Sequence, residues 1–290
     1  MEELICSQED QPGEHYSYRE IADALPASKS SVQRMVKRKG YRAYKRLSTP
    51  QMSKGCRKRS LERSASLADR FSENSLRRLI FQDEKDFSLQ VLTNRQNNRV
   101  YSSGPKAEII PERLYHEGNR FSKKVMVSAI LSWKGASKPF FVGGSSLKTN
   151  GKSYLKHLKN DLLPSMKNLY PNNDFTFIQD SAPSHRAKTV QDFLKEELRR
   201  RFVPNTEWPP TSPDCNPLDY YFWNDVKERV YMDRHGKPFE SEEELKEKIC
   251  QVWDAAVGDI KNIRKAIKQF LPRLRAVVEK DGGSIKTLFG

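Results

Sequence analysis

No stretch of this sequence is apolar for long enough to cross a bilayer, and its start, Met1–Leu4, lacks the basic and apolar regions of a signal peptide. Cysteine is scarce as well. Cys6, Cys56, Cys215 and Cys250 lie far apart, and no two of them form a C-x-x-C pair. A zinc site needs clustered ligands, and disulfide frameworks are typical of secreted chains. We therefore expect four reduced thiols in a cytosolic or nuclear protein.

Acidic residues are too few to balance the basic ones. The 290 residues include 52 Lys and Arg against 37 Asp and Glu, which gives a formal net charge of +15. From Ser28 to Arg63 there are 13 Lys or Arg and one acid, Glu62, a segment charge of +12. A surplus of this size favours a polyanion, and without a membrane segment nucleic acid is the expected partner. The uneven distribution predicts a basic N-terminal module joined to a larger globular domain.

Two short helices are predicted within and just before the basic stretch. Residues 18–25 form the first, and Ser28 can N-cap a second from 29 to about 39, which Gly40 ends. A tight turn between two helices, the second basic, is typical of a helix-turn-helix, although many helical hairpins share this shape. The segment charge favours DNA binding, because phosphate contacts supply most non-specific affinity. The residues expected to contact DNA are Lys29, Ser30, Gln33, Arg34, Lys37, Arg38, Arg42, Lys45 and Arg46.

After a polar linker that becomes helical near residues 61–71, the pattern changes to that of a mixed α/β domain. Short apolar runs that end on an acid predict buried strands. Turn residues around Trp133 predict a hairpin. The expected strands cover 79–81, 88–92, 124–131, 139–142 and 175–179, and the expected helices cover 153–163, 187–200 and most of the tail after 241.

Three aspartates stand out as candidate metal ligands. Asp83 and Asp180 each follow an apolar strand, and two ionised carboxylates on neighbouring strands repel unless a divalent cation lies between them. Asp219 is the third position of a helix that Asn216 can cap and Pro217 can begin. Each also has an ordinary reading. A strand-ending Asp often starts a turn, and Asp219 can complete a capping box with Asn216.

Three segments resemble the signature motifs of one family. Phe177–His185 (FIQDSAPSH) is similar to the Q-D-x-A-P-x-H signature of the Tc/mariner transposases. Trp208–Asp219 (WPPTSPDCNPLD) resembles their W-P-P-x-S-P-D-L-N-P-x-D/E motif, and Phe81–Lys85 (FQDEK) resembles their F-x-D-E-K strand. The motifs occur in family order, and the resemblance covers roughly Tyr16 to the C-terminus.

The resemblance implies an α/β fold, an RNase H-like catalytic domain preceded by a small all-α helix-turn-helix module. It implies domains at 1–47 (helix-turn-helix), 48–75 (basic linker and helix) and 76–290 (catalytic). Asp83, Asp180 and Asp219 would then be the catalytic residues and would bind two Mg²⁺ or Mn²⁺ ions, which assist cleavage of transposon ends and strand transfer. The implied partners are double-stranded DNA, both terminal repeats and target, and a second copy in a homodimer; no membrane partner is expected, and the implied location is the nucleus.

Residues beside the triad are assigned mainly structural roles. Glu84 adjoins Asp83, but along a strand its side chain points to the other face. Asp214 is expected in a turn, and His185 is expected either to orient DNA or to cap the next helix, with the structural role favoured. Trp208 and Trp223 are expected to pack in the core rather than to stack on bases.

The sequence also departs from the family pattern. There are 38 residues between Asp180 and Asp219, about four more than in better-known branches, and the third acid is Asp, as in mariner-like members. Pro26 stands where the helix-turn-helix turn usually has Gly. Only about fifteen residues precede Tyr16, too few for the first of the two modules usual in the family. The alternative function is therefore a truncated or domesticated DNA-binding protein without catalytic activity; an RNA-binding protein would need a signature that is not found.

Overall fold

The computed structural model describes residue 4 and residues 16–41, 51–90, 123–143, 150–234 and 237–289. The chain divides into two compact units, Met1–Thr49 and Pro50–Gly290, which are described separately below. Within these ranges, no helix combines the length and apolarity that crossing a membrane requires.

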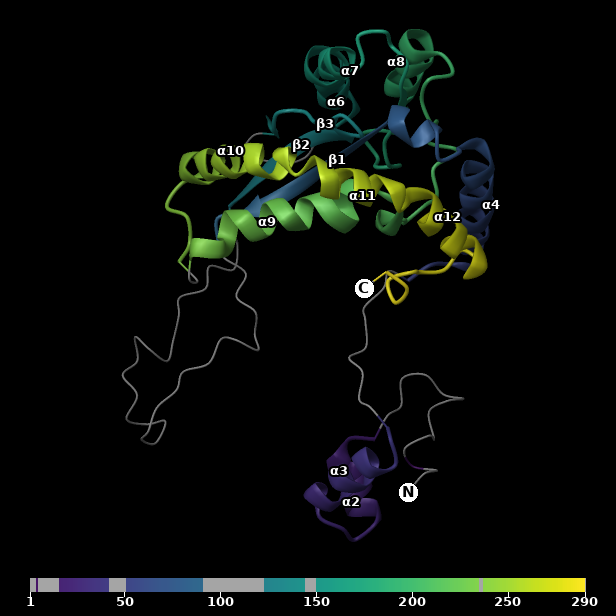
Figure 1. Ribbon diagram of the computed structural model, residues 1–290, viewed down its shortest axis with the longest axis vertical. Helices are drawn as coiled ribbons and strands as arrows, with labels where there is room; N and C mark the ends of the chain where they lie inside the picture. The colour runs from purple at the N-terminus through teal and green to yellow at the C-terminus, as the bar shows by residue number, and fades with distance from the viewer. Residues whose placement is uncertain are drawn as a thin grey trace. The chain divides into compact units, whose positions relative to one another are not determined.

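The first unit contains two helices, α2 (Tyr18–Ala24) and α3 (Lys29–Arg38), which are drawn in purple in Figure 1. Ser17 and Glu20 form a capping box at the start of α2, and the side chain of Ser28 accepts a hydrogen bond from the backbone N–H of Ser31 in α3. The two helices meet through a small core of Ile21, Ala22, Val32 and Val36. Both predicted helices are therefore present, and Pro26 in the turn between them has a φ of +20°, which a proline ring disfavours.

A five-stranded sheet forms the centre of the second unit. Its order is β3-β2-β1-β5, and β4 also pairs with β2. Strand β1 runs antiparallel to β2 and parallel to β5. The strands are β1 (Leu79–Ser88), β2 (Lys124–Ser132), β3 (Gly135–Ala136), β4 (Phe140–Val142) and β5 (Thr176–Ile178).

Strand β1 is longer than its apolar residues suggested. The sequence predicted separate strands at 79–81 and 88–92, but one strand continues through the polar segment Gln82–Asp86. Each of these residues pairs with a residue of β2, from Gln82 opposite Ile130 to Asp86 opposite Met126. The neighbouring strand supplies the backbone hydrogen bonds, so a polar stretch can stay extended inside the sheet.

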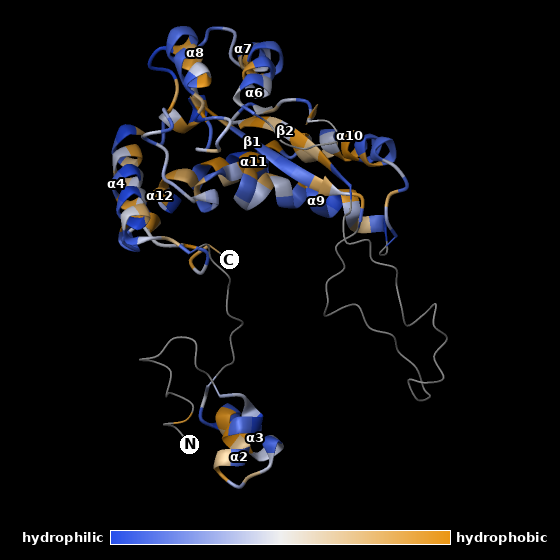
Figure 2. Cartoon of the chain, turned by 180° about the vertical axis from the view of Figure 1, so that it is seen from behind, coloured by the Kyte–Doolittle hydropathy of each residue, from blue (hydrophilic) through white to orange (hydrophobic). Residues whose placement is uncertain are grey.

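Helices cover both faces of the sheet (Figures 1 and 2), as expected for the α/β class. One face packs Ile80, Ile130 and Phe177 against one group of helices. This group is α6 (Gly151–His157), a π-helical turn (Leu158–Leu162), α7 (Leu163–Leu169) and α8 (Lys188–Leu198).

The opposite face packs Phe81 and Leu131 against Trp223, Trp253 and Phe270 in the larger core cluster. The aromatic rings of Phe81 and Phe270 meet edge to face, with centroids 5.0 Å apart. The helices on this side are α4 (Lys54–Arg70), α9 (Trp223–Tyr231), α10 (Glu242–Gly258), α11 (Ile260–Lys268) and α12 (Phe270–Glu279).

Helix α4 belongs to the second unit, which differs from the predicted separate segment at 48–75. Leu67 of α4 has its side chain buried in the core of this unit. Arg57 donates hydrogen bonds to the carbonyls of Lys280 and Asp281, at 2.9 Å each, just after α12. The next residue, Gly282, has a φ of +78°, and a Cβ there would lie 2.1 Å from the Arg57 carbonyl oxygen. The sequence spacing of 223 and 224 residues explains why local patterns did not predict this contact.

Candidate active site

Asp83 lies in the middle of β1, on the face covered by α9. Its side chain is 8% exposed, and its Oδ2 accepts a hydrogen bond from Nε1 of Trp223 at 2.7 Å. Trp223 was predicted to pack in the core, and it does; the structure adds its contact with a candidate metal ligand. Glu84 points to the opposite face, as strand geometry predicts, because successive side chains alternate.

Asp219 is positioned by the residue that caps its helix. The side-chain oxygen of Asn216 accepts from the backbone N–H of Leu218 at 3.1 Å, and its Nδ2 donates to the carbonyl of Gln82 at 3.2 Å. The cap therefore joins the start of this helix to β1 beside Asp83. Asp219 lies in the π-helical turn Leu218–Phe222, and its Oδ1 is 3.9 Å from Nζ of Lys85 rather than closing a capping box.

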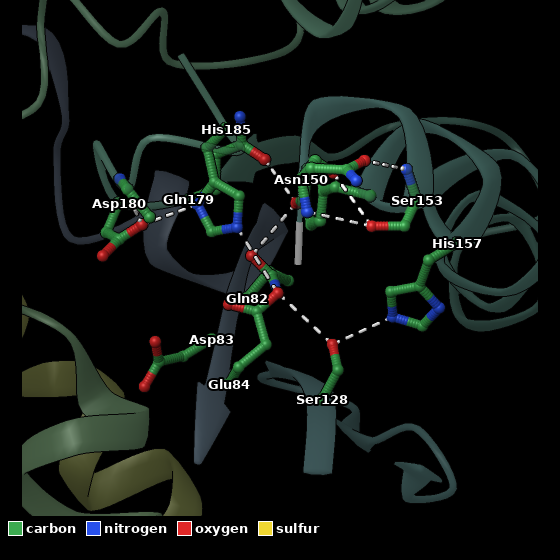
Figure 3. A network of polar contacts seen from close by, with 12 residues as sticks. Gln82, Asp83, Glu84, Ser128, Asn150, Ser153, His157, Gln179, Asp180 and His185 are labelled. Carbon is green, nitrogen blue, oxygen red and sulfur yellow. Dashed lines mark hydrogen bonds and ion pairs between the residues drawn. The ribbon is translucent and has the colours of Figure 1, made fainter. Parts of the chain in front are cut away.

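Asp180 follows β5 and accepts hydrogen bonds from residues that come shortly after it in the chain. Its Oδ1 accepts hydrogen bonds from the backbone N–H of Ala182 at 2.9 Å and from Nδ1 of His185 at 2.6 Å. The other ring nitrogen of His185 is 3.4 Å from Oε1 of Glu84 (Figure 3). His185 is 1% exposed, so it forms a buried bridge between two carboxylates from separate strands.

The charges of this bridge are mutually compensated. Burial lowers the pKa of His185, but the charge of Glu84 and the hydrogen bond to Asp180 outweigh it and raise the pKa to about 10. Burial raises the pKa of Asp180, but the hydrogen bond and the charge of His185 outweigh burial and lower it. His185 is therefore an imidazolium that keeps Asp180 ionised.

The charges of the Asp83–Asp219 pair are compensated only in part. Burial, followed by the charges of Asp219 and Glu84, holds the pKa of Asp83 well above its usual range despite the hydrogen bond from Trp223. Burial also raises the pKa of Asp219 to about 6, against the opposing charge of Lys85. Asp180 adds to the negative potential at both carboxyls. The three aspartates thus lie within electrostatic reach of one another, and two of them resist ionisation without a nearby cation.

Carboxylate oxygens, such as those of Asp83, Asp180 and Asp219, are the type of ligand that Mg²⁺ and Mn²⁺ prefer. In the described ranges, no group of three or more His, Cys, Asp and Glu side chains is close enough to hold one ion. The residues nevertheless fit a cation chemically, because a positive charge beside them would offset the burial and the neighbouring carboxylate charges that raise the pKa values of Asp83 and Asp219.

A cavity of about 350 Å³ opens beside these acids. Asp180 and Asp219 both line it, together with the cationic side chain of Arg186. The Trp208–Pro213 segment forms another wall, in which Thr211 has a φ of +52°. Asp214, predicted in a turn, lies in the short 3-10 helix Pro213–Cys215, and its carbonyl accepts a hydrogen bond from Nη1 of Arg273 at 3.0 Å. The cavity brings two of the three predicted acids to one surface that a substrate can reach.

Sequence reasoning missed a polar network on the other face of β1 (Figure 3). The buried hydroxyl of Tyr154 lies 2.5 Å from Oε1 of Gln179 and 3.2 Å from Oε1 of Gln82. The Tyr154 ring also packs on His185, with centroids 4.1 Å apart. The alternation of polar Gln82 and Glu84 along β1 was a usable signal, because it places both side chains on one face. The network makes His185 a site residue, and it does not cap α8, whose N-cap is Ala187 without a side-chain hydrogen bond.

The predicted DNA-contacting residues fall into two groups. Those on α3 share an exposed surface of the first unit. These are Lys29, Ser30, Gln33, Arg34, Lys37 and Arg38. The others, Arg42, Lys45 and Arg46, lie outside the described residues.

The sequence is similar to those of known transposases. Residues 78–246, more than half of the chain, match the DDE superfamily endonuclease family. The chain is 25% identical over 266 residues to the Tc3 transposase of Caenorhabditis elegans, covering 90% of this chain and 73% of that protein. It is 35% identical over 81 residues to the Tcb2 transposase of Caenorhabditis briggsae, covering 28% and 26%.

Solved structures agree with the fold. A Mos1 transposase paired-end complex with the left transposon end has a TM-score of 0.78 at 22% identity, over 98% of this chain and 79% of that one. The catalytic domain of Mos1 mariner transposase has a TM-score of 0.60 at 20% identity, over 83% and 100%. The expected RNase H-like fold is thereby confirmed.

The matched family and the acid-lined cavity define an endonuclease of the DDE superfamily, an enzyme of the polynucleotidyl-transferase type. The three motifs and the sequence similarity to the Tc3 transposase identify the branch. The chain belongs to the Tc/mariner transposases.

Proposed function

We propose that Asp83, Asp180 and Asp219 form the catalytic centre at which this transposase cleaves transposon-end DNA and joins the cut end to target DNA. The observation that carries the proposal is the pair of buried Asp83 and half-buried Asp219 beside Asp180, whose raised pKa values show that nearby groups compensate their charges only in part. Carboxylates whose charge is only partly compensated in a buried place destabilise a fold, so a functional cation is the simplest reason for them.

The proposed cofactor is a pair of Mg²⁺ or Mn²⁺ ions held by these carboxylates. When bound, such ions activate the attacking oxygen and stabilise the leaving oxygen in an in-line displacement at phosphorus. Support comes from the oxygen-only donor set and from Mos1 paired-end complexes that were solved with Mn and with Mg. No covalent enzyme intermediate is required for this reaction class.

Neighbouring side chains would orient the acids. His185 holds Oδ1 of Asp180, which leaves Oδ2 to face a ligand, and Trp223 holds Oδ2 of Asp83 in the same way. Such supporting hydrogen bonds orient metal ligands. Lys85 and Arg186 place positive charge next to Asp219 and along the cavity, where each suits a DNA phosphate.

The proposed substrate is double-stranded DNA, bound partly through the exposed cations of α3. The similar Mos1 structures are paired-end and pre-cleavage complexes, which supports transposon ends as the DNA and a homodimer as the assembly. We also propose a nuclear location, where the chromosomal DNA substrate is found. The alternative, a DNA-binding protein without catalysis, is not favoured, because all three acids and the matched endonuclease domain are present.

The test is cleavage and joining of short duplex DNA by the full chain, with Mg²⁺, with Mn²⁺ and with EDTA. We expect metal-dependent products that fall to background in Asp83→Ala, Asp180→Ala and Asp219→Ala. The matched control is Asp192→Ala, because Asp192 is an exposed carboxylate paired with Lys188. Tight, salt-sensitive DNA binding without cleavage in either metal would instead support the non-catalytic alternative.

A further inference from the structure

Trp133 lies in the turn between β2 and β3 and is surrounded by cations from separate parts of the second unit. The charged groups of Arg77, Arg264 and Lys268 lie 5.8, 5.4 and 5.8 Å from the centre of its ring. Arg264 also donates from Nε to the carbonyl of Trp133 at 3.1 Å. The electron-rich ring faces attract these charges and hold them together at the surface.

A cavity of about 280 Å³ adjoins the ring. Arg77, Lys268 and Arg275 line it and contribute +3, while Glu73 contributes −1, so the lining carries +2. Among the described residues, no acid lies within ion-pair distance of Arg77, Arg264, Lys268 or Arg275. Unneutralised like charges raise the energy of a free surface, and an anionic ligand offsets this cost.

The cluster is separate from the acidic centre. Leu131 pairs with Phe81, and Ala129 pairs with Asp83. Trp133 follows the end of β2, four residues after Ala129, and packs against the same core cluster. At about 3.4 Å per residue this is roughly 14 Å along the sheet direction. Trp133 also lies near the start of β1, whereas Asp180 follows the end of the parallel strand β5.

We propose that Arg77, Lys268, Arg275 and Arg264, assembled on Trp133, form a second DNA-backbone site of this transposase. It would bind phosphates of a stretch of DNA other than the nucleotides at the three aspartates. Arginine supplies paired N–H donors that match two phosphate oxygens, and lysine supplies a point charge. The choice of DNA as the anion rests on the proposed function.

The test is binding of a short labelled duplex by the full chain in EDTA, measured by fluorescence anisotropy across a series of salt concentrations. The variant is R77Q/K268Q/R275Q. Each lost phosphate contact lowers the slope of log K against log salt by about 0.9, so we expect a slope smaller by about 2 to 3. The matched control, K152Q/K156Q/K195Q, removes the same charge from exposed positions on α6 and α8, across the sheet, and should keep the wild-type slope.

A third variant, R77K/K268R/R275K, keeps the charge and should also keep the slope. All the substituted side chains are exposed, so melting temperatures should stay near that of the wild type. An unchanged slope in R77Q/K268Q/R275Q, or an equal loss in the control, would overturn the site.

Cleavage by the same preparations separates this proposal from the catalytic one. An unchanged slope together with metal-dependent cleavage would reject the second DNA site and leave the proposed function standing. A reduced slope in the variant, together with no metal-dependent cleavage by the wild type, would reject the proposed catalytic function and leave the second DNA site standing.

Discussion

Replacing Asp219 with asparagine should stabilise the metal-free protein at neutral pH while it removes cleavage. The cause is the cost of ionising this carboxyl in the folded state. Burial raises its pKa from 3.8 to about 6, and the charge of Lys85, with Nζ at 3.9 Å, offsets burial only in part. The side chain is 26% exposed, so solvent screens it only modestly.

The sign and size follow from proton linkage. The unfolded carboxyl loses its proton near pH 3.8 and the folded one near pH 6, so between these values the folded state binds more protons. The free energy of unfolding therefore falls as pH rises through this window. Two pH units at about 1.4 kcal/mol each give a loss of about 3 kcal/mol above pH 6. Asparagine does not ionise, so Asp219→Asn should recover about 3 kcal/mol, or roughly 6 to 12 °C in Tm.

Urea unfolding in EDTA measures this difference, at neutral pH and again below the usual pKa of the carboxyl. The gain should be present at neutral pH and vanish in acid. Asp233→Asn is the control, because its exposed carboxylate pairs only loosely with Lys248 at 3.8 Å, and it should change stability by less than about 0.5 kcal/mol. Adding Mn²⁺ should stabilise the wild type more than Asp219→Asn. A variant no more stable than the wild type at neutral pH, or a gain independent of pH, would refute the reasoning.

Three further changes test two contacts in the site and one contact between α4 and the segment after α12. His185→Ala removes the hydrogen bond to Asp180 and should weaken metal affinity or cleavage by about 10- to 100-fold, measured as cleavage rate against Mn²⁺ concentration; an unaltered curve would contradict the bridge. Trp223→Phe removes the donor to Asp83 and should cost about 1 to 3 kcal/mol in urea unfolding, whereas a change near zero would deny that hydrogen bond a stabilising role. Gly282→Ala forces a Cβ toward the Arg57 carbonyl at a φ of +78° and should cost about 1 to 3 kcal/mol in thermal unfolding. Gly258→Ala, with no atom near the added carbon, should not be destabilising; equal losses in both would show that the Gly282 contact is unimportant.

Local patterns predicted the elements that carry the acids. The apolar run at Phe175–Gln179 predicted β5, and Asn216 with Pro217 predicted the start of the helix that holds Asp219. These features depend on neighbours in sequence, so single-sequence reasoning can find them. The family motifs then connected the three segments, and the fold confirmed that all belong to one unit.

The contacts that tune the site depend on residues far apart in the chain. Trp223 and Asp83 are 140 positions apart, and His185 and Glu84 are 101 apart, so no spacing rule linked them. The length of β1 was underestimated from the sequence because the middle of the strand is polar. A strand that carries site residues loses the apolar signal by which strands are found in sequence.

The most direct measurement of the central claim is the rate of Mg²⁺- or Mn²⁺-dependent DNA cleavage by the full chain and by Asp180→Ala. Asp180 is the most informative of the three, because it is held ionised by His185 and lines the cavity with Asp219. The account predicts cleavage by the wild type that EDTA abolishes and that the variant lacks, while both bind DNA with equal affinity in EDTA. Metal-dependent cleavage that survives in Asp180→Ala would contradict the account.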